Sequence, residues 1–137
     1  MNQICIHTED TDLAEAFEIF FEGKYQINVL GSAEDATRHL SMPDCQCKVF
    51  IYDAINPSNN DIQYLKQLKK AHANLKIVIC YVYFEEKHIS ESLLASQVDA
   101  IIYKPFDLAE VDRQLQKLMV PPTLEITVRA VSTHNSV

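Results

Sequence analysis

Short apolar runs alternate with stretches of helical periodicity from the start of the chain to about Met119. The runs cover residues 4–7, 25–30, 48–52, 77–81 and 100–103, and their length and content of β-branched and aromatic residues predict strands. The run at 48–52 is apolar over nearly its whole length, which is typical of a strand covered on both faces. Because helical patterns separate these strands, the chain is predicted to be an α/β protein made of successive βαβ units.

The helical segments are marked by apolar residues three or four positions apart and by capping residues at their ends. Residues 8–12 supply side chains that cap helices, Gly23 ends the first helix, and Ser32 caps a second helix that stops before Pro43. A shorter and weaker helix is expected around residues 88–95. The apolar positions of the first, third and last helices are Leu13, Phe17, Phe20 and Phe21; Ile62, Leu65 and Leu68; and Leu108, Val111, Leu115 and Leu118.

Residues 120–137 form a tail behind a globular domain of residues 1–119. Pro121 and Pro122 stop the last helix at or before Val120. In residues 124–128, Leu, Ile and Val alternate with Glu and Thr, as in a half-buried strand. Three roles stay open for this tail: an added strand at a sheet edge, a segment that joins a partner, or a disordered end.

Composition and charge limit the classes of function. The chain has 12 Lys and Arg residues against 19 Asp and Glu residues, and its net charge of −7 opposes attraction to nucleic acid or to an anionic membrane. No apolar stretch approaches the roughly 20 residues needed to span a bilayer, and the N-terminus lacks the features of a secretory signal. We therefore expect a cytoplasmic protein that binds neither nucleic acid nor membrane.

The cysteines and histidines do not form a metal-site pattern. Cys5 and Cys80 lie in predicted core strands, where a reduced cysteine behaves as a small hydrophobe. Cys45 and Cys47 lack a second Cys or His pair at the spacing of a zinc site, and they are interpreted as packing residues at a strand entry. No cysteine or histidine is therefore assigned to a metal.

Polar side chains follow the carboxyl ends of four predicted strands. In open parallel sheets these ends meet at one edge, where diverging loops leave a crevice. The residues at these positions are Glu9 and Asp10 after the first strand, Asp53 at the end of the third, Tyr81 at the end of the fourth and Lys104 after the fifth. The sequence therefore predicts one shared pocket that contains carboxylates and an ammonium group.

Two fragments in this arrangement resemble the receiver domain of bacterial response regulators. Residues 50–57, FIYDAINP, look like the strand that ends in the phosphoacceptor aspartate of that family, with a proline four residues later. Residues 101–106, IIYKPF, look like its lysine-proline-phenylalanine signature, and Lys104 follows Asp53 by 51 residues. The resemblance covers about residues 3–119. It implies a flavodoxin-like, doubly wound sheet of five parallel strands in the order 2-1-3-4-5.

The resemblance also implies a site and its partners. Asp53 would accept a phosphoryl group from a histidine kinase or a phosphotransfer protein, and Lys104 would neutralise phosphoryl charge. Weakly bound magnesium (Mg²⁺) would be held by Glu9, Asp53 and the backbone carbonyl of Ile55, with Asp10 as an alternative acid. A downstream protein would dock on the surface of helix 4, strand 5 and helix 5, and a homodimer is compatible with this arrangement. The expected docking residues are His88, Ile101, Tyr103 and Phe106.

Three positions depart from the family pattern. Thr8 stands where receivers usually have the first of two adjacent acids, Tyr81 replaces a small hydroxyl residue, and Ile101 replaces an aromatic switch residue. Two functions therefore remain: a stand-alone receiver in a phosphorelay, and a phosphorylation-independent pseudo-receiver that binds a protein as an adaptor. Neither is an enzyme beyond self-phosphorylation and autodephosphorylation. A flavin-binding enzyme is disfavoured because the acidic residues in 8–12 would repel a bound phosphate.

Overall fold

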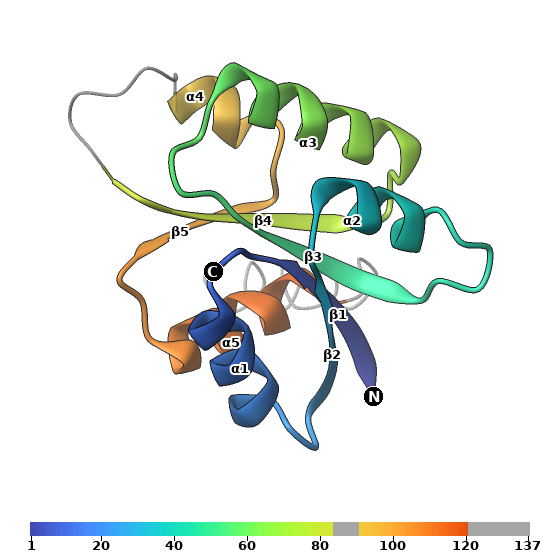
Figure 1. Cartoon of the computed structure of the whole chain (residues 1–137), viewed down its shortest axis with the longest axis vertical. Coiled ribbons are helices and arrows are strands. Elements are labelled where there is room, and N and C mark those ends of the chain that lie inside the picture. Colours follow the sequence, from blue (N-terminus) through green and yellow to red (C-terminus); the bar gives the residue numbers. More distant parts are fainter. Residues whose placement is uncertain (84–90, 121–137) are drawn as a thin grey trace, which may run out of the picture.

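The computed structural model describes residues 1–83 and 91–120, which form a twisted parallel sheet covered by helices on both faces (Figure 1). The sheet has the strand order β2-β1-β3-β4-β5, and each neighbouring pair is parallel. The predicted fold class and strand order are therefore confirmed. In chain order the elements are β1 (Asn2–His7), α1 (Thr11–Phe20), β2 (Tyr25–Leu30), α2 (Ala33–Leu40), β3 (Cys47–Asp53), α3 (Asn59–Ala71), β4 (Lys76–Val82), α4 (Glu91–Ala95), β5 (Ala100–Lys104) and α5 (Leu108–Leu118).

The helices bury their apolar stripes in two layers, one on each face of the sheet. Helices α1 and α5 pack on one face, where Phe17 and Leu115 share a core with Ile51 of β3. Helices α2, α3 and α4 cover the other face, where Leu65 and Leu94 pack against Phe50. Figure 1 shows the two layers above and below the sheet. The central strand β3 is buried from Val49 onward because both of its faces are covered, as its apolar run predicts.

Side-chain caps begin the helices where the sequence predicts them. The carboxylate of Asp10 accepts hydrogen bonds from the backbone N–H groups of Asp12 and Leu13, at 3.0 and 3.1 Å, and so begins α1. Ser32 accepts from the backbone N–H of Asp35 at 3.0 Å and begins α2. In the turn between α1 and β2, Gly23 has a positive φ of 80°, a backbone conformation that favours glycine.

The strand register aligns the carboxyl ends of β1, β3, β4 and β5. His7 pairs with Tyr52, Asp53 pairs with Cys80, and Val82 pairs with Lys104. The loops that follow these strands therefore leave the sheet from a common edge.

Two predicted elements lie partly or wholly outside the described residues. The helix expected at 88–95 is present as α4, but residues 88–90 are not among those described. The tail from residue 121 onward, with its predicted strand, is also outside them, so the boundary at residue 119 stays a prediction. Among residues 1–83 and 91–120, no helix is both long and apolar enough to cross a membrane.

Candidate functional site

Asp53 and Lys104 meet at the carboxyl edge of the sheet as a largely buried ion pair. Asp53 is the last residue of β3 and Lys104 the last of β5, so the two strands bring together charges that are far apart in the sequence. The ammonium nitrogen of Lys104 lies 2.5 Å from Oδ1 of Asp53, and the two side chains are 22% and 3% exposed. Such a pair is held by charge, and removal of either partner leaves the other charge uncompensated in a poorly solvated place.

The hydroxyl of Thr8 holds the other carboxylate oxygen of Asp53. Thr8 follows β1 directly and is buried, and its Oγ1 donates a hydrogen bond to Oδ2 of Asp53 at 2.6 Å. The same hydroxyl accepts a hydrogen bond from the backbone N–H of Asp10 at 3.0 Å. Oδ1 is in ion-pair contact with Lys104 but has no hydrogen-bond partner among the described residues, so Oδ2 is the hydrogen-bonded oxygen of this carboxylate.

The acids near this pair do not form a ready set of magnesium ligands. Glu9 is exposed, and the carboxylate of Asp10 is engaged as the cap of α1. Within the described part of the chain, no three His, Cys, Asp or Glu side chains are placed to hold a metal ion together. Mg²⁺ prefers oxygen ligands that include one or two carboxylates, and the one buried carboxylate here already has two partners. The donor set as it stands does not fit Mg²⁺, and the ligand roles of Glu9, Asp53 and the Ile55 carbonyl stay predictions.

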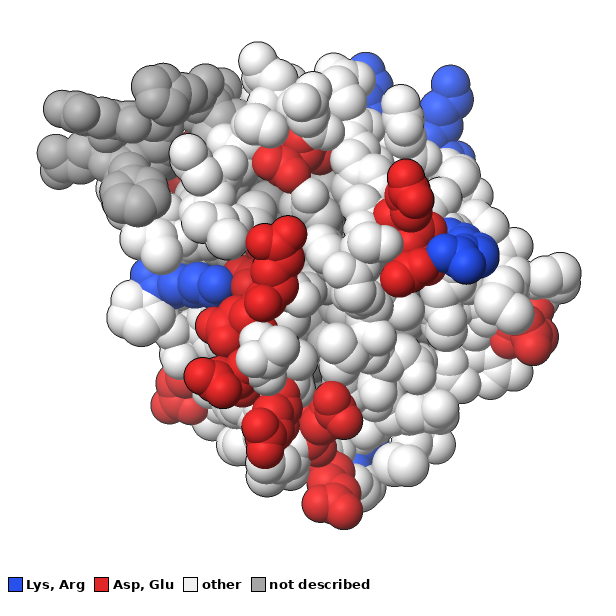
Figure 2. Space-filling view, in the orientation of Figure 1, with Lys and Arg blue, Asp and Glu red and all other residues white. Residues whose placement is uncertain are grey.

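Acidic side chains dominate the surface beside the site. Figure 2 shows red side chains gathered over α1, and the exposed acids of that helix are Asp12, Glu15 and Glu18. Because the Asp53–Lys104 pair has no net charge, these acids set the sign of the local potential. The potential is negative, which opposes the approach of an anionic phosphodonor.

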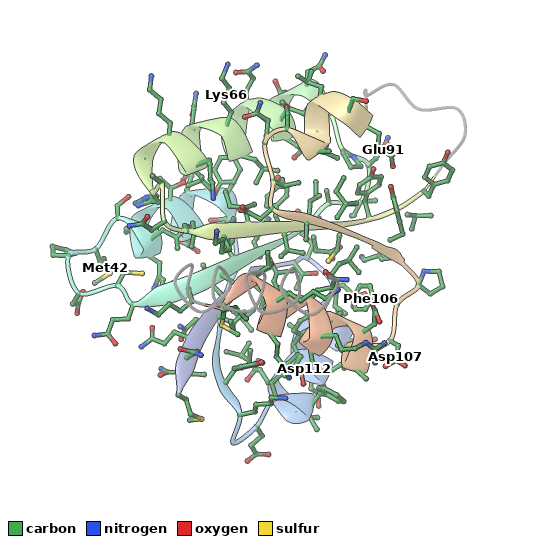
Figure 3. The ribbon with its side chains drawn as sticks, turned by 180° about the vertical axis from the view of Figure 1, so that it is seen from behind. Met42, Lys66, Glu91, Phe106, Asp107 and Asp112 are labelled. Carbon is green, nitrogen blue, oxygen red and sulfur yellow. The ribbon has the colours of Figure 1, made fainter. Side chains whose placement is uncertain are left out.

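Tyr81 lies on the opposite face of β4 from Cys80 and directs its phenol towards α4. It is 2% exposed, and its hydroxyl donates to Oε1 of Glu91 at 3.0 Å. The hydroxyl of Tyr103 donates to the same oxygen, so Glu91 joins β4 and β5 at the start of α4 (Figure 3). Burial, together with the Glu91 carboxylate, raises the pKa of Tyr81. Ile101 is half-buried and packs against the core cluster that contains Tyr81 and Leu94.

Cys80 is a neighbour of the ion pair that the sequence does not single out. It is the cross-strand partner of Asp53, and its backbone carbonyl accepts from the N–H of Ala54 at 3.0 Å. Burial and the charge of Asp53 raise the pKa of its thiol to about 12, while Lys104 acts in the opposite direction. The thiol is therefore protonated at neutral pH. Only the register of β3 against β4 places it here, because the apolar pattern of β4 alone is that of a core strand.

Several solved structures are similar to this chain in fold, at low sequence identity. No protein-family model matches this sequence, and no curated protein matches it. The response regulator TrrA of Thermotoga maritima, solved in complex with Mg²⁺ and BeF, is 19% identical, with a TM-score of 0.70 over 87% of this chain and 100% of that chain. A receiver domain from a Francisella response regulator is 20% identical, with a TM-score of 0.70 over 86% of this chain and 96% of that one.

A protein that is not named as a response regulator also has a similar fold. A pilus assembly-related protein of Burkholderia pseudomallei is 16% identical, with a TM-score of 0.68 over 86% of this chain and 89% of that chain. At such identities the likeness establishes the fold alone. Together with the strand order and the helices on both faces, it shows that this chain has the fold of response-regulator receiver domains.

Proposed function

We propose that this chain is a receiver-type signalling module that binds a protein partner without phosphorylation, with Asp53 and Lys104 as a structural ion pair. The observation that carries the proposal is that Thr8 and Lys104 together engage both oxygens of the Asp53 carboxylate. Each of these contacts stabilises the charge of the free carboxylate and so makes its oxygens weaker nucleophiles towards phosphorus. The geometry therefore supports a binding module better than a phosphoryl acceptor. Such a module would act in the cytoplasm.

Electrostatics supports the same proposal. Two like unit charges 4 Å apart repel by about 4 kcal/mol at an effective dielectric constant of 20. A carboxylate that attacks a phosphoryl anion meets this repulsion unless cations neutralise it. Lys104 supplies one positive charge, while α1 beside the site carries exposed acids. Without a further cation the attack is unfavourable.

The proposed partner surface consists of α4, β5 and α5. Two large apolar residues on it are exposed, Leu93 by 49% and Tyr103 by 42%, and Tyr83, which follows β4, is 50% exposed beside them. The rings of Tyr83 and Tyr103 meet edge to face with their centroids 5.6 Å apart. A hollow of about 470 Å³ between β5 and α5 is lined in part by Ile101, Tyr103 and Phe106. Aromatic side chains of this kind are enriched at protein interfaces. His88 lies outside the described residues.

A second candidate function is phosphoryl acceptance by Asp53, which the contact between Asp53 and Lys104 at the strand ends favours. In this role a histidine kinase or a phosphotransfer protein would donate the phosphoryl group. Lys104 would move from the carboxylate to the phosphoryl oxygens. Attack by Oδ2 would weaken the hydrogen bond that it accepts from Thr8.

Incubation of the protein with acetyl phosphate or with beryllofluoride, each with Mg²⁺, distinguishes the two functions. Intact mass and NMR shifts would be compared between wild type and Asp53→Asn. The proposal expects no Asp53-dependent adduct and no Asp53-dependent shift. A phosphoryl adduct that forms in wild type and is absent in Asp53→Asn would refute it and establish the second candidate.

Thr8→Asp is the matched positive control for Mg²⁺ binding because it places a carboxylate where Thr8 stands. Beside Asp53, a second buried carboxylate creates a need for a cation. We expect Mg²⁺ to raise the thermal unfolding midpoint of Thr8→Asp and to leave that of wild type unchanged. Equal stabilisation of both proteins by Mg²⁺ would mean that Thr8 does not suppress metal binding.

A further inference from the structure

The outer edge of β2 borders a groove between α1 and α2. The groove has a volume of about 360 Å³ and is lined by Glu18 of α1, residues 27–30 of β2 and His39 of α2. Val29 in this groove is 39% exposed, and the buried Nε2 atom of His39 has no hydrogen-bond partner among the described residues. The groove thus combines apolar surface with an unused polar atom.

In the described residues, β2 is paired on one side only. Its partner is β1, and it is the last strand in the order of the sheet. Its outer N–H and C=O groups therefore form a row that an extended segment can pair with. An extended segment is the kind of occupant that fits this edge.

The topology of the fold selects the edge of the sheet at which a strand after α5 can pair. Helix α5 packs on the same face of the sheet as α1, and the α1 connection leads from β1 to β2. Connections between parallel strands are right-handed in about 98% of cases. With a right-handed connection, a strand that follows α5 lies on the β2 side of β5. The free edge of the sheet on that side is β2. A strand beyond β5 would need a left-handed connection.

Helix α5 packs beside the amino end of β2, and Leu118 near its end lies against the core cluster that contains Tyr25. The carboxylate of Asp112 in α5 accepts a hydrogen bond from the hydroxyl of Tyr25 at 2.8 Å and pairs with Lys24, so α5 contacts the amino end of β2 (Figure 3). The three residues 121–123 can bridge at most roughly 10 Å, at about 3.3 Å for each extended residue. A link of that length suits a parallel strand, which would begin beside the amino end of β2. An antiparallel strand would first have to pass the whole length of β2.

We propose that residues 124–128 of this chain form a sixth, parallel strand that pairs with the outer edge of β2. The apolar residues of this segment, Leu124, Ile126 and Val128, share one face. That face covers Val29 and the half-buried Ile27 on the α1 side of the sheet. Thr127 lies on the other face, towards His39.

Two substitutions one residue apart test this proposal in the full-length chain. Ile126→Asp places a charge on the apolar face of the segment, and Thr127→Asp places the same charge on the polar face. Amide hydrogen exchange is followed by mass spectrometry in residues 25–30 and, as the reference edge strand, in residues 100–104. We expect exchange in 25–30 to be at least tenfold faster in Ile126→Asp than in wild type. Thr127→Asp should match wild type, and residues 100–104 should be unchanged in all three proteins.

Three results would overturn the proposal. Equal exchange of residues 25–30 in wild type and Ile126→Asp would mean that the segment does not cover β2. Equal acceleration by both substitutions would rule out an apolar face directed at the sheet. Protection in wild type that is lost on dilution, together with a dimer in light scattering, would mean that a second copy supplies the strand.

Discussion

The side chain of Thr8, which follows β1, donates a hydrogen bond at 2.6 Å to Oδ2 of Asp53, the last residue of β3. Both residues are buried, at 7% and 8% exposure. The contact closes the side of the carboxylate that Lys104 leaves open, and it places a neutral hydroxyl beside Asp53. The stability of the site therefore rests on three side chains at the carboxyl ends of three strands.

Thr8→Val should destabilise the protein while preserving the shape of the side chain. Valine cannot donate, so Oδ2 of Asp53 loses its partner, and an unsatisfied buried acceptor costs about 1–3 kcal/mol. The free energy of unfolding in urea measures this loss. Thr11→Val changes an exposed threonine in the same way and should leave the free energy of unfolding nearly unchanged. A Thr8→Val protein as stable as wild type would show that the hydrogen bond contributes nothing net.

Lys104→Met should be more damaging because it leaves the carboxylate of Asp53 buried without a countercharge. We expect a loss of roughly 2–4 kcal/mol, somewhat below the range for a fully buried pair because the Lys104 side chain is partly exposed. The exposed Lys66 provides the matched control, and Lys66→Met should leave the unfolding free energy within about 0.5 kcal/mol of wild type. If Lys104→Met and Lys66→Met behave alike, the ion pair is not a structural element.

The double variant Asp53→Asn with Lys104→Met completes this cycle. If the pair is structural, the double variant should be more stable than the sum of the two single losses predicts, because it leaves no unpaired charge. Additive losses would contradict the coupling of the two residues.

Stability should fall at alkaline pH in a way that depends on Tyr25. Burial, followed by the Asp112 carboxylate, raises the pKa of Tyr25 to about 12. A group whose pKa is raised on folding contributes its full stability below the pKa of the unfolded state, about 10 for tyrosine, and loses that contribution as the pH rises towards 12. Tyr25→Phe removes this titration. Wild type should therefore lose more stability than Tyr25→Phe between pH 9 and 11 in urea titrations at each pH, and parallel pH profiles would contradict this assignment.

The order of strands and helices along the chain follows from the sequence, because short apolar runs and 3.6-residue periods are local properties of the chain. The buried positions Ile62, Leu65 and Leu68 of α3 follow from that period alone, and Ser32 was identifiable as a cap from its place before a helical pattern. The convergence of Asp53 and Lys104 was also predictable, since the carboxyl ends of parallel strands share one edge.

The contacts between groups at that edge could not be predicted from local patterns and are set by the folded structure. Thr8 was recognised as a departure from a pattern, but its hydrogen bond to Asp53 depends on the relative position of two loops. Tyr81 could have pointed into the site, yet the face of β4 on which it lies directs its phenol to Glu91 in α4. Cys80 became a neighbour of Asp53 through strand register. Periodicity reports which side of an element is buried, whereas contacts across the sheet depend on register and rotamer, which no local pattern encodes.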